Sequence, residues 1–278
     1  MTIAIEFRAA LILIASSLIF LSTGLAELAK ADTVLITGAN SGIGLEFTKQ
    51  YAAKGWMVIA THRRSSVPAS LAAVKAEFDN VRVERMDVTN STDISALAQE
   101  LSDLPIDVLL NNAGVYNDRG NCSEDNCPGD WSTQNFGHLR YGLYDTIMAV
   151  NVKGPLMVAE AFVGNVLASD QKKIISISST NGSLTEQLGG SGAIFYRASK
   201  AALNRAMQLV SASLQHDEVI VVLLHPGAVL TERQAHLYEF QGMVEMPFTV
   251  AHMIETIDGV TIADTGRFMR YDGMTVPW

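Results

Sequence analysis

Short apolar runs rich in β-branched residues alternate with longer amphipathic stretches along most of this chain. A run such as 33–37 (TVLIT) predicts a buried strand, and the stretch after each run has helical spacing. Alternating strands and helices predict βαβ units, because a parallel neighbour can be reached only through a long crossover connection. The runs are apolar at consecutive positions, which is typical of a sheet buried on both faces. The sequence therefore predicts an α/β fold with a doubly wound parallel sheet of about seven strands.

The predicted elements follow one another without an internal repeat or a low-complexity linker. Strands are predicted at 33–37, 56–61, 81–86, 106–110, 173–178 and 219–224, and helices at 69–78, 92–102, 141–168 and 197–216. A further helix is expected to open after a glycine-rich turn and to run to about Lys54. We therefore expect a single domain over 32–278.

Composition excludes several classes of protein. The chain of 278 residues is 48% apolar and 18% charged, which argues against a disordered protein. Its net charge of −9 argues against a nucleic-acid partner, because such a partner requires a basic surface. Two cysteines are too few for a disulfide scaffold or a cysteine-rich zinc site, and the six histidines lack metal-ligand spacing. No metal is expected.

The N-terminal segment 1–31 differs from the rest of the chain. It is uncharged throughout 9–26, at the lower edge of what spans a hydrocarbon layer of ~30 Å as a helix. The same stretch suits the core of an export signal, and the alanines at 29 and 31 fit a cleavage site that would leave Asp32 first. Three interpretations stay open: a cleaved signal peptide, an uncleaved membrane anchor through 9–26, and a start codon assigned too far upstream for a cytoplasmic protein.

The segment 117–135 interrupts the alternation of strands and helices. It is polar, rich in turn residues, and holds both cysteines, Cys122 and Cys127. We expect a surface loop inserted before the long helix, and loops of this length are usually functional or mobile. The cysteines are either two free thiols or a disulfide, and a disulfide would require an oxidising compartment and so favour export. The loop either borders the substrate entrance or lies on the surface without a role.

A glycine-rich turn between the first strand and the first helix predicts a dinucleotide site. Glycines at 38, 42 and 44 permit a tight turn and close approach of the backbone to a pyrophosphate. The helix that begins there directs free N–H groups and the positive end of its dipole at the phosphates. A glycine triplet alone is weak support, but here it follows a strand and opens a helix, as the mechanism requires.

The end of the second strand predicts which nucleotide binds. A site for the unphosphorylated ribose usually carries an acidic residue there, whereas this chain has Arg63 and Arg64. A guanidinium at this place would pair with a 2′-phosphate. We therefore favour NADP(H) over NAD(H), with two merely solvated arginines as the alternative.

A tyrosine and a lysine near position 200 form a candidate acid–base pair. Tyr196 and Lys200 are four residues apart on a predicted helix, so they lie on one face. A lysine cation beside a phenol favours the phenolate, which makes a tyrosine a usable acid or base. The spacing alone is common, and its meaning depends on the other motifs.

Those motifs occur in a specific order. The chain carries TGANSGIG (37–44), Asp87-Val88, NNAG (111–114), Asn151, Ser178-Ser179, YRASK (196–200) and Pro226-Gly227. Over 32–278 this ordered set resembles the short-chain dehydrogenase/reductase family, which implies a Rossmann-type domain. Within the family, NNAGVY (111–116), NVKGP (151–155), HPG (225–227) and the ending GRFMRYDGMTVPW (266–278) are similar to carbonyl reductases of the sniffer and C-factor-like group.

The resemblance implies catalytic roles for four residues. Tyr196 would give a proton to a carbonyl, or take one from an alcohol. Lys200 would lower the pKa of Tyr196 and hold the nicotinamide ribose. Ser179 would hydrogen-bond the substrate oxygen, and Asn151 would complete a proton relay through water and Lys200.

Two further details follow from the resemblance. The stretch from Ser179 to Tyr196 is longer than in the commonest branch of the family, so Ser178 and Ser183 stay open as alternatives to Ser179. The family builds its substrate lid in the segment matching 231–248. The apolar residues there suggest a binding wall, although core packing explains them equally well; they are Phe240, Met243, Met246 and Phe248.

The resemblance also implies where the cofactor binds. The glycine turn would hold the pyrophosphate, Asp87 and Val88 would contact adenine, and Pro226-Gly227 would cover the nicotinamide. The expected cofactor-binding residues are Gly38, Asn40, Ser41, Gly42, Ile43, Gly44, Arg63, Asp87, Val88, Asn112, Ala113, Gly114, Tyr196, Lys200, Pro226, Gly227, Val229 and Thr231.

The expected function is that of an NADP(H)-dependent oxidoreductase acting on a small carbonyl compound or the corresponding alcohol. The alternatives are a nucleotide-binding signalling or redox-sensing protein of the C-factor type with little turnover, and an epimerase or dehydratase of the same family. The family pairs helices matching 141–168 and 197–216 into dimers or tetramers, so we expect a homo-oligomer. The protein is expected to be periplasmic or secreted, or membrane-anchored, according to the fate of 1–31. Export would separate it from the cytosol, where nicotinamide cofactors are recycled.

Overall fold

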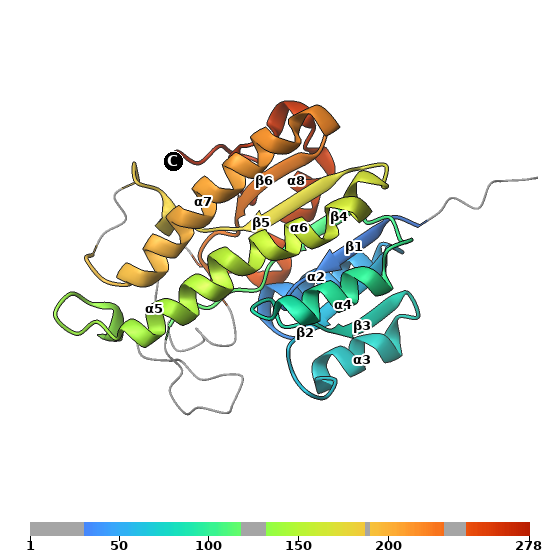
Figure 1. Cartoon of the computed structure of the whole chain (residues 1–278), viewed down its shortest axis with the longest axis horizontal. Helices are drawn as coiled ribbons and strands as arrows, with labels where there is room; N and C mark the ends of the chain where they lie inside the picture. Colours follow the sequence, from blue (N-terminus) through green and yellow to red (C-terminus); the bar gives the residue numbers. More distant parts are fainter. Residues whose placement is uncertain (1–30, 118–131, 187–189, 231–242) are drawn as a thin grey trace, which may run out of the picture. The chain divides into compact units, whose positions relative to one another are not determined.

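The computed structural model describes residues 31–117, 132–186, 190–230 and 243–278, and Asp32–Trp278 form one compact unit. A seven-stranded parallel sheet in the order β3-β2-β1-β4-β5-β6-β9 lies at its centre (Figure 1). The strands are β1 (Thr33–Ile36), β2 (Met57–His62), β3 (Val81–Arg85), β4 (Val108–Asn111), β5 (Lys173–Ile177), β6 (Ile220–His225) and β9 (Phe268–Arg270). The predicted doubly wound parallel sheet is confirmed.

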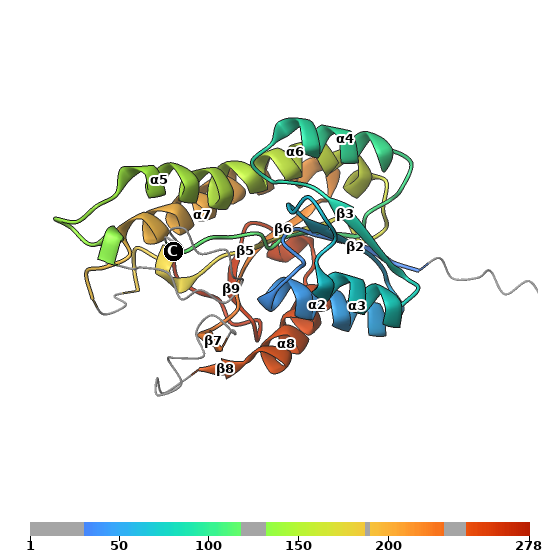
Figure 2. The ribbon, with the colours of Figure 1, turned by 90° about the horizontal axis from the view of Figure 1, so that it is seen from below.

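Helices cover both faces of the sheet. The helices are α2 (Gly42–Ala53), α3 (Ala69–Glu77), α4 (Ser91–Glu100), α5 (Tyr141–Met148), α6 (Gly154–Leu167), α7 (Ile194–Leu214) and α8 (Met246–Gly259). Figure 2 shows α2, α3 and α8 on one face of the sheet, and α4, α6 and α7 on the other. The chain therefore has the three-layer arrangement that parallel strands with helical crossovers require.

Successive residues of each strand enter two different cores. In β1, Val34 and Ile36 pack with Phe47 and other side chains of the α2 side, whereas Leu35 belongs to the core on the α4 side. The strand β4 alternates in the same way. Side chains of consecutive strand residues point to opposite faces, so a strand covered on both faces must be apolar at every position. This is the physical reason for the continuous apolar runs in the sequence.

The first six strands lie within two residues of their predicted bounds, but the C-terminal part of the fold was not predicted. The last strand of the sheet, β9, ends at the charged residue Arg270. It forms because it pairs with β6, where Phe268 lies opposite Leu223. The helix α8 and the small parallel pair β7 (Val229–Leu230) and β8 (Val244–Glu245) were also missed. Short strands carry too little periodicity to be found from sequence.

The long predicted helix 141–168 is a continuous helical segment with an irregular middle. A π-helical turn, Ala149–Lys153, joins α5 to α6 and places Asn151 at its centre. Such turns occur frequently at functional sites. Among the described residues, Tyr141–Leu167 is the one helix long and apolar enough to cross a membrane. It packs against α4 and α7 and against the sheet, as a core helix does.

The strand order reverses between β1 and β4, and this position locates the site. The chain leads outward from β1 to β2 and β3 on one side, and from β4 to β5 and β6 on the other. The loops at the carboxyl ends of β1 and β4 therefore diverge and leave a crevice, which is where ligands bind in open α/β sheets. The predictions for the N-terminal segment, for both cysteines and for Thr231 and Phe240 lie outside the described residues. Of the segment 117–135, which was predicted as a surface loop, Asn117 and 132–135 are described, and Asn117, Thr133 and Gln134 are buried rather than exposed.

Candidate active site

The glycine turn after β1 has the backbone geometry that the sequence predicts. Gly38 has φ +65°, and a side chain there would place its Cβ 2.9 Å from the Cα of Ala113. Gly42 has φ +55° and is the first residue of α2. Asn112, which follows β4, donates from Nδ2 to the carbonyl of Thr37 at 2.9 Å and to that of Gly38 at 3.3 Å. The two loops are thus held against each other, with the N-terminus of α2 at the crevice.

The packing of Gly44 leads to a stability prediction. A Cβ on Gly44 would lie 2.4 Å from both the carbonyl oxygen of Gly38 and Nδ2 of Asn112. We expect Gly44→Ala to reduce the free energy of unfolding by about 1–3 kcal/mol through overpacking and to weaken cofactor binding. Gly164 is the matched control, because it is exposed on α6 with open space at its Cβ position. Gly164→Ala should instead stabilise by up to ~1 kcal/mol. Thermal unfolding and cofactor titration measure both effects, and an unchanged melting temperature for Gly44→Ala would contradict the close packing.

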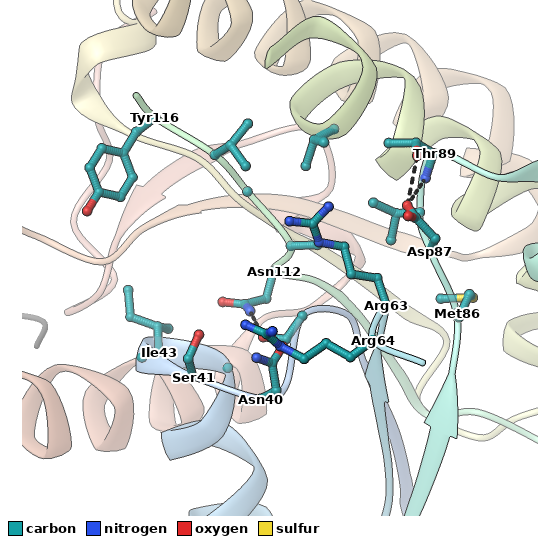
Figure 3. A pocket seen from close by; sticks show the side chains of 18 of the residues that line it. Asn40, Ser41, Ile43, Arg63, Arg64, Met86, Asp87, Thr89, Asn112 and Tyr116 are labelled. Atoms are coloured by element: carbon teal, nitrogen blue, oxygen red, sulfur yellow. Dashed lines mark hydrogen bonds between the residues drawn. The ribbon is translucent and has the colours of Figure 1, made fainter. Parts of the chain in front are cut away.

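One pocket brings together the predicted cofactor residues from four loops. Its lining includes Gly38, Asn40, Ser41, Gly42, Ile43, Gly44, Arg63, Asp87, Val88, Asn112, Ala113 and Gly114. Figure 3 shows the side chains of Arg63 and Arg64 entering the pocket between the Asn40–Ser41 turn and Asp87. Both arginines are exposed, so an anion can reach them from solvent. The carboxylate of Asp87 accepts from the backbone N–H and the hydroxyl of Thr89 at 2.9 and 2.8 Å, so it is oriented by its own turn.

The predicted catalytic pair lies on α7 beside this pocket. The ammonium of Lys200 is 5.8 Å from the centroid of the Tyr196 ring and donates to the carbonyl of Ile177, at the end of β5, at 2.8 Å. A Cβ on Gly114, which lines the pocket, would be 4.0 Å from Nζ of Lys200. Ser179 is the second residue after β5, and its hydroxyl hydrogen-bonds the phenol of Tyr196. The three side chains therefore meet at the carboxyl edge of the sheet.

The electrostatics of the pair differ from the expectation. Burial raises the pKa of Tyr196 above its ordinary value, and the hydrogen bond from Ser179 only partly offsets this. Burial also lowers the pKa of Lys200 to about 8. The net pKa of Tyr196 is therefore raised rather than lowered as expected, because burial, which disfavours the charged form of each group, is the largest influence on both. Tyr196 is a neutral phenol near pH 7, and Lys200 exchanges its proton close to that pH.

The structure separates the three candidate serines. Ser178 donates its hydroxyl hydrogen to the side chain of Asn204. The hydroxyl of Ser183 accepts from the backbone N–H groups of two residues in the following turn. Ser179 alone of the three bonds the phenol, so the geometry favours it over both alternatives.

Asn151 contacts the loop after β4 and the helix α7. Its Oδ1 accepts from the backbone N–H of Val115 at 2.8 Å, and its Nδ2 donates to the carbonyl of Val115 at 2.7 Å. The same Nδ2 lies 3.0 Å from the hydroxyl of Ser199. Asn151 thus ties the π-helical turn to the loop after β4 and to α7, and a Cβ on Gly114 would lie 3.6 Å from its Oδ1.

Among the described residues, the other predicted cofactor contacts are not part of this pocket's lining; they are Tyr196, Lys200, Pro226, Gly227 and Val229. Pro226 and Gly227 follow β6, where a Cβ on Gly227 (φ +83°) would be 3.1 Å from the ring of Tyr271. Val229 is buried in β7. Burial, with Arg270 and Lys200 as further causes, lowers the pKa of His225 to about 4, so this histidine is neutral near pH 7.

In the predicted lid segment, Met246 packs against the core on the α2 side. Phe248 is half exposed, and its ring contacts that of His252 in a tilted arrangement.

Sequence reasoning missed several residues of the site. The pocket is also lined by Met86, Thr89, Val115, Tyr116, Thr146 and Val150. The ring of Tyr116 meets that of Tyr196 edge to face, with centroids 6.4 Å apart. For Tyr116, the sequence signal was its position two residues after NNAG. Nothing in the sequence indicated that Thr146 and Val150 line the pocket, because the direction of their helix depends on packing.

Comparison with known proteins agrees with this geometry. The family model described as short chain dehydrogenase matches residues 32–242, and the chain belongs to this family. It is 33% identical over 183 residues to the C-signal of Myxococcus xanthus, covering 66% of this chain and 99% of that protein. The fold superposes on the NADPH-bound carbonyl reductase from chicken fatty liver with a TM-score of 0.77 and 26% identity, covering 90% of this chain and 100% of the other. The carbonyl reductase Sniffer of D. melanogaster shares the fold, with a TM-score of 0.75 and 24% identity over 90% and 100% of the two chains.

Proposed function

We propose that this protein is an NADP(H)-dependent carbonyl reductase that uses Tyr196 as its acid. Family membership makes it an oxidoreductase of the short-chain type, and the proposal specifies the reaction. The observation that best supports this proposal is the position of Gly114. This residue lines the nucleotide pocket and lies beside both Lys200 and Asn151. A nucleotide in the pocket would therefore end where the Tyr196 phenol and the Ser179 hydroxyl are already joined.

The residues of the site fit both the cofactor and the reaction. When bound, NADP(H) supplies or accepts the hydride. The hydroxyls of Ser179 and Tyr196 are two donors for a carbonyl oxygen, which gains negative charge during reduction. Tyr196 gives its Oη proton to that oxygen, and its raised pKa keeps this proton in place beforehand. The ammonium of Lys200 stabilises the phenolate that remains and, with a pKa of about 8, can return a proton near neutral pH.

The two arginines after β2 support a preference for the phosphorylated cofactor. We expect Arg63→Ser to raise the Kd for NADPH about 10-fold or more, because a charge-assisted contact to the 2′-phosphate is worth about 1.5–3 kcal/mol. The Kd for NADH, which lacks that phosphate, should stay within about twofold. Arg64→Ser tests the neighbouring guanidinium in the same way. Fluorescence titration measures the Kd of both cofactors for the unmodified protein and for each variant, and tighter binding of NADH than NADPH to the unmodified protein would refute the preference.

A second candidate function is nucleotide-dependent signalling with little turnover. The similarity to the C-signal of Myxococcus xanthus, which spans 99% of that protein, is what favours it. The two functions differ in one measurement. Cofactor binding without product formation over a broad panel of aldehydes, ketones and quinones would support the signalling candidate, whereas turnover with NADPH would support the reductase.

A further inference from the structure

A buried glutamine outside the predicted site touches the backbone of two active-site tyrosines. Gln134 closes the 3₁₀ turn Ser132–Gln134, and its side chain is completely buried. Its Nε2 donates to the carbonyl oxygen of Tyr116 at 2.7 Å, and its Oε1 accepts from the backbone N–H of Tyr196 at 2.9 Å. A single amide group therefore joins the loop after β4, which lines the pocket, to the helix that carries the proposed acid.

The start of α7 explains why such a bond is needed there. A helix begins with N–H groups that have no partner within the helix, and a polar N-cap side chain usually accepts from one of them. The residue before α7 is Ala193, which has φ +58° and no side-chain oxygen to serve as a cap. Tyr196 is the third residue of the helix, and Gln134 accepts from its N–H as an N-cap residue would. The capping group is supplied from a distant part of the chain.

The other backbone polar atom of Tyr196 is held toward the same loop. The carbonyl oxygen of Tyr196 accepts from the hydroxyl of Ser199 at 2.7 Å. That hydroxyl receives a hydrogen bond from Nδ2 of Asn151 at 3.0 Å, and Asn151 is bonded to both backbone groups of Val115. The N–H of Tyr196 is linked through Gln134 to Tyr116, and its C=O is linked through Ser199 and Asn151 to Val115.

We propose that Gln134 is a positioning residue for Tyr196: it fixes the first turn of α7 against the Val115–Tyr116 segment and so holds the phenol at the end of the nucleotide pocket. This inference rests on the proposed function of Tyr196 as the acid. Gln134 touches neither substrate nor cofactor in this account. Its effect comes from geometry, because a displacement of about 1 Å of a reacting group can reduce a rate about 10²-fold.

The experiment compares two variants of Gln134 in the full chain with a matched control. Gln134→Leu removes both hydrogen bonds, whereas Gln134→Glu keeps an acceptor for the N–H of Tyr196 and loses the donor to Tyr116. Gln99→Leu, on the exposed surface of α4, is the control for replacing a glutamine by leucine. The measurements are kcat and KM with NADPH and an aldehyde, the Kd for NADPH, the pH profile of kcat, and hydrogen exchange at the amide of Tyr196.

We expect Gln134→Leu to reduce kcat about 10–100-fold and to leave the Kd for NADPH within about twofold. The acidic and basic limbs of its pH profile should shift, because the environment of the phenol changes. Hydrogen exchange at the Tyr196 amide should be faster in Gln134→Leu, and Gln134→Glu should restore part of the protection. Gln99→Leu should match the unmodified protein. If Gln134→Leu does not fold, slower turnover of folded Gln134→Glu with a protected Tyr196 amide supports the proposal.

The inference is overturned if folded Gln134→Leu keeps the kcat, the pH profile and the amide protection of the unmodified protein. It is also overturned if turnover falls only in proportion to cofactor affinity. Tyr196→Phe separates this result from a failure of the proposed function. An inactive Tyr196→Phe beside a fully active Gln134→Leu refutes the positioning role alone, whereas an active Tyr196→Phe refutes the catalytic assignment.

Discussion

Replacing Tyr196 by phenylalanine is expected to reduce carbonyl reduction by about 10²–10⁴-fold, the usual contribution of a positioned general acid. The substitution removes the Oη proton and the hydrogen bond to Ser179 while keeping the ring and its edge contact with Tyr116. Affinity for NADPH should persist, because Tyr196 is not among the residues that line the nucleotide pocket. Steady-state kinetics and fluorescence titration of the same preparation measure the two quantities.

The matched control for this variant is Tyr141→Phe. Tyr141 lies at the start of α5 and is 69% exposed, so removal of its hydroxyl should leave turnover unchanged. A Tyr196→Phe variant with full activity would show that another group supplies the proton. A variant that loses NADPH binding together with activity would place Tyr196 in the cofactor site instead.

Lys200→Met is expected to lower turnover about 10²-fold and to change how stability depends on pH. The loss of turnover follows because a neighbouring cation shifts the pKa of an acidic group by about 1–3 units, and the phenolate of Tyr196 would lose that stabilisation. Lys200 is buried, with Nζ bonded to the carbonyl of Ile177. Methionine fills the space of the lysine side chain without a charge.

The pH dependence follows from the lowered pKa of Lys200. In the unfolded chain this lysine is protonated below its ordinary pKa of 10.5, whereas in the folded protein burial lowers the pKa to about 8. Folding is therefore disfavoured by the buried charge below pH 8, and this penalty decreases between pH 8 and 10.5. One pKa unit corresponds to about 1.36 kcal/mol, so the total effect is about 3 kcal/mol. Lys200→Met lacks the penalty.

The difference between the two proteins isolates this effect, because all other titrating groups are common to both. From pH 7 to 10.5 the unmodified protein should gain about 3 kcal/mol of unfolding free energy relative to Lys200→Met. Urea unfolding at several pH values measures the difference. A difference that does not change with pH would mean that Lys200 keeps its ordinary pKa in the folded protein.

The regular part of this protein could be predicted from its sequence for a physical reason. Strands buried on both faces are apolar at every position, and glycines mark the turn where the backbone must adopt positive φ at 38 and 42. Those constraints are local, so they are visible in a single sequence. The strand β9 is not local, because its three residues form a strand only by pairing with β6.

The sequence predicted the residues of the candidate site better than it predicted the interactions between them. Tyr196, Lys200 and Ser179 meet as expected, but the pKa of Tyr196 is raised because burial, which a sequence does not report, exceeds the other influences. Gln134 was not predicted because it lies in a polar stretch and acts on α7, distant in sequence. Its partner is a backbone N–H, which leaves no signal in residue identity.

The central claim is that this protein transfers hydride from NADPH to a carbonyl carbon with Tyr196 as the acid. The most direct measurement supplies NADPH carrying deuterium at the transferable position with a panel of aldehydes and ketones, and analyses the products by mass spectrometry. We expect a deuterated alcohol product that forms with the unmodified protein and is nearly absent with Tyr196→Phe. Tight NADPH binding with no labelled product from any member of the panel would contradict it.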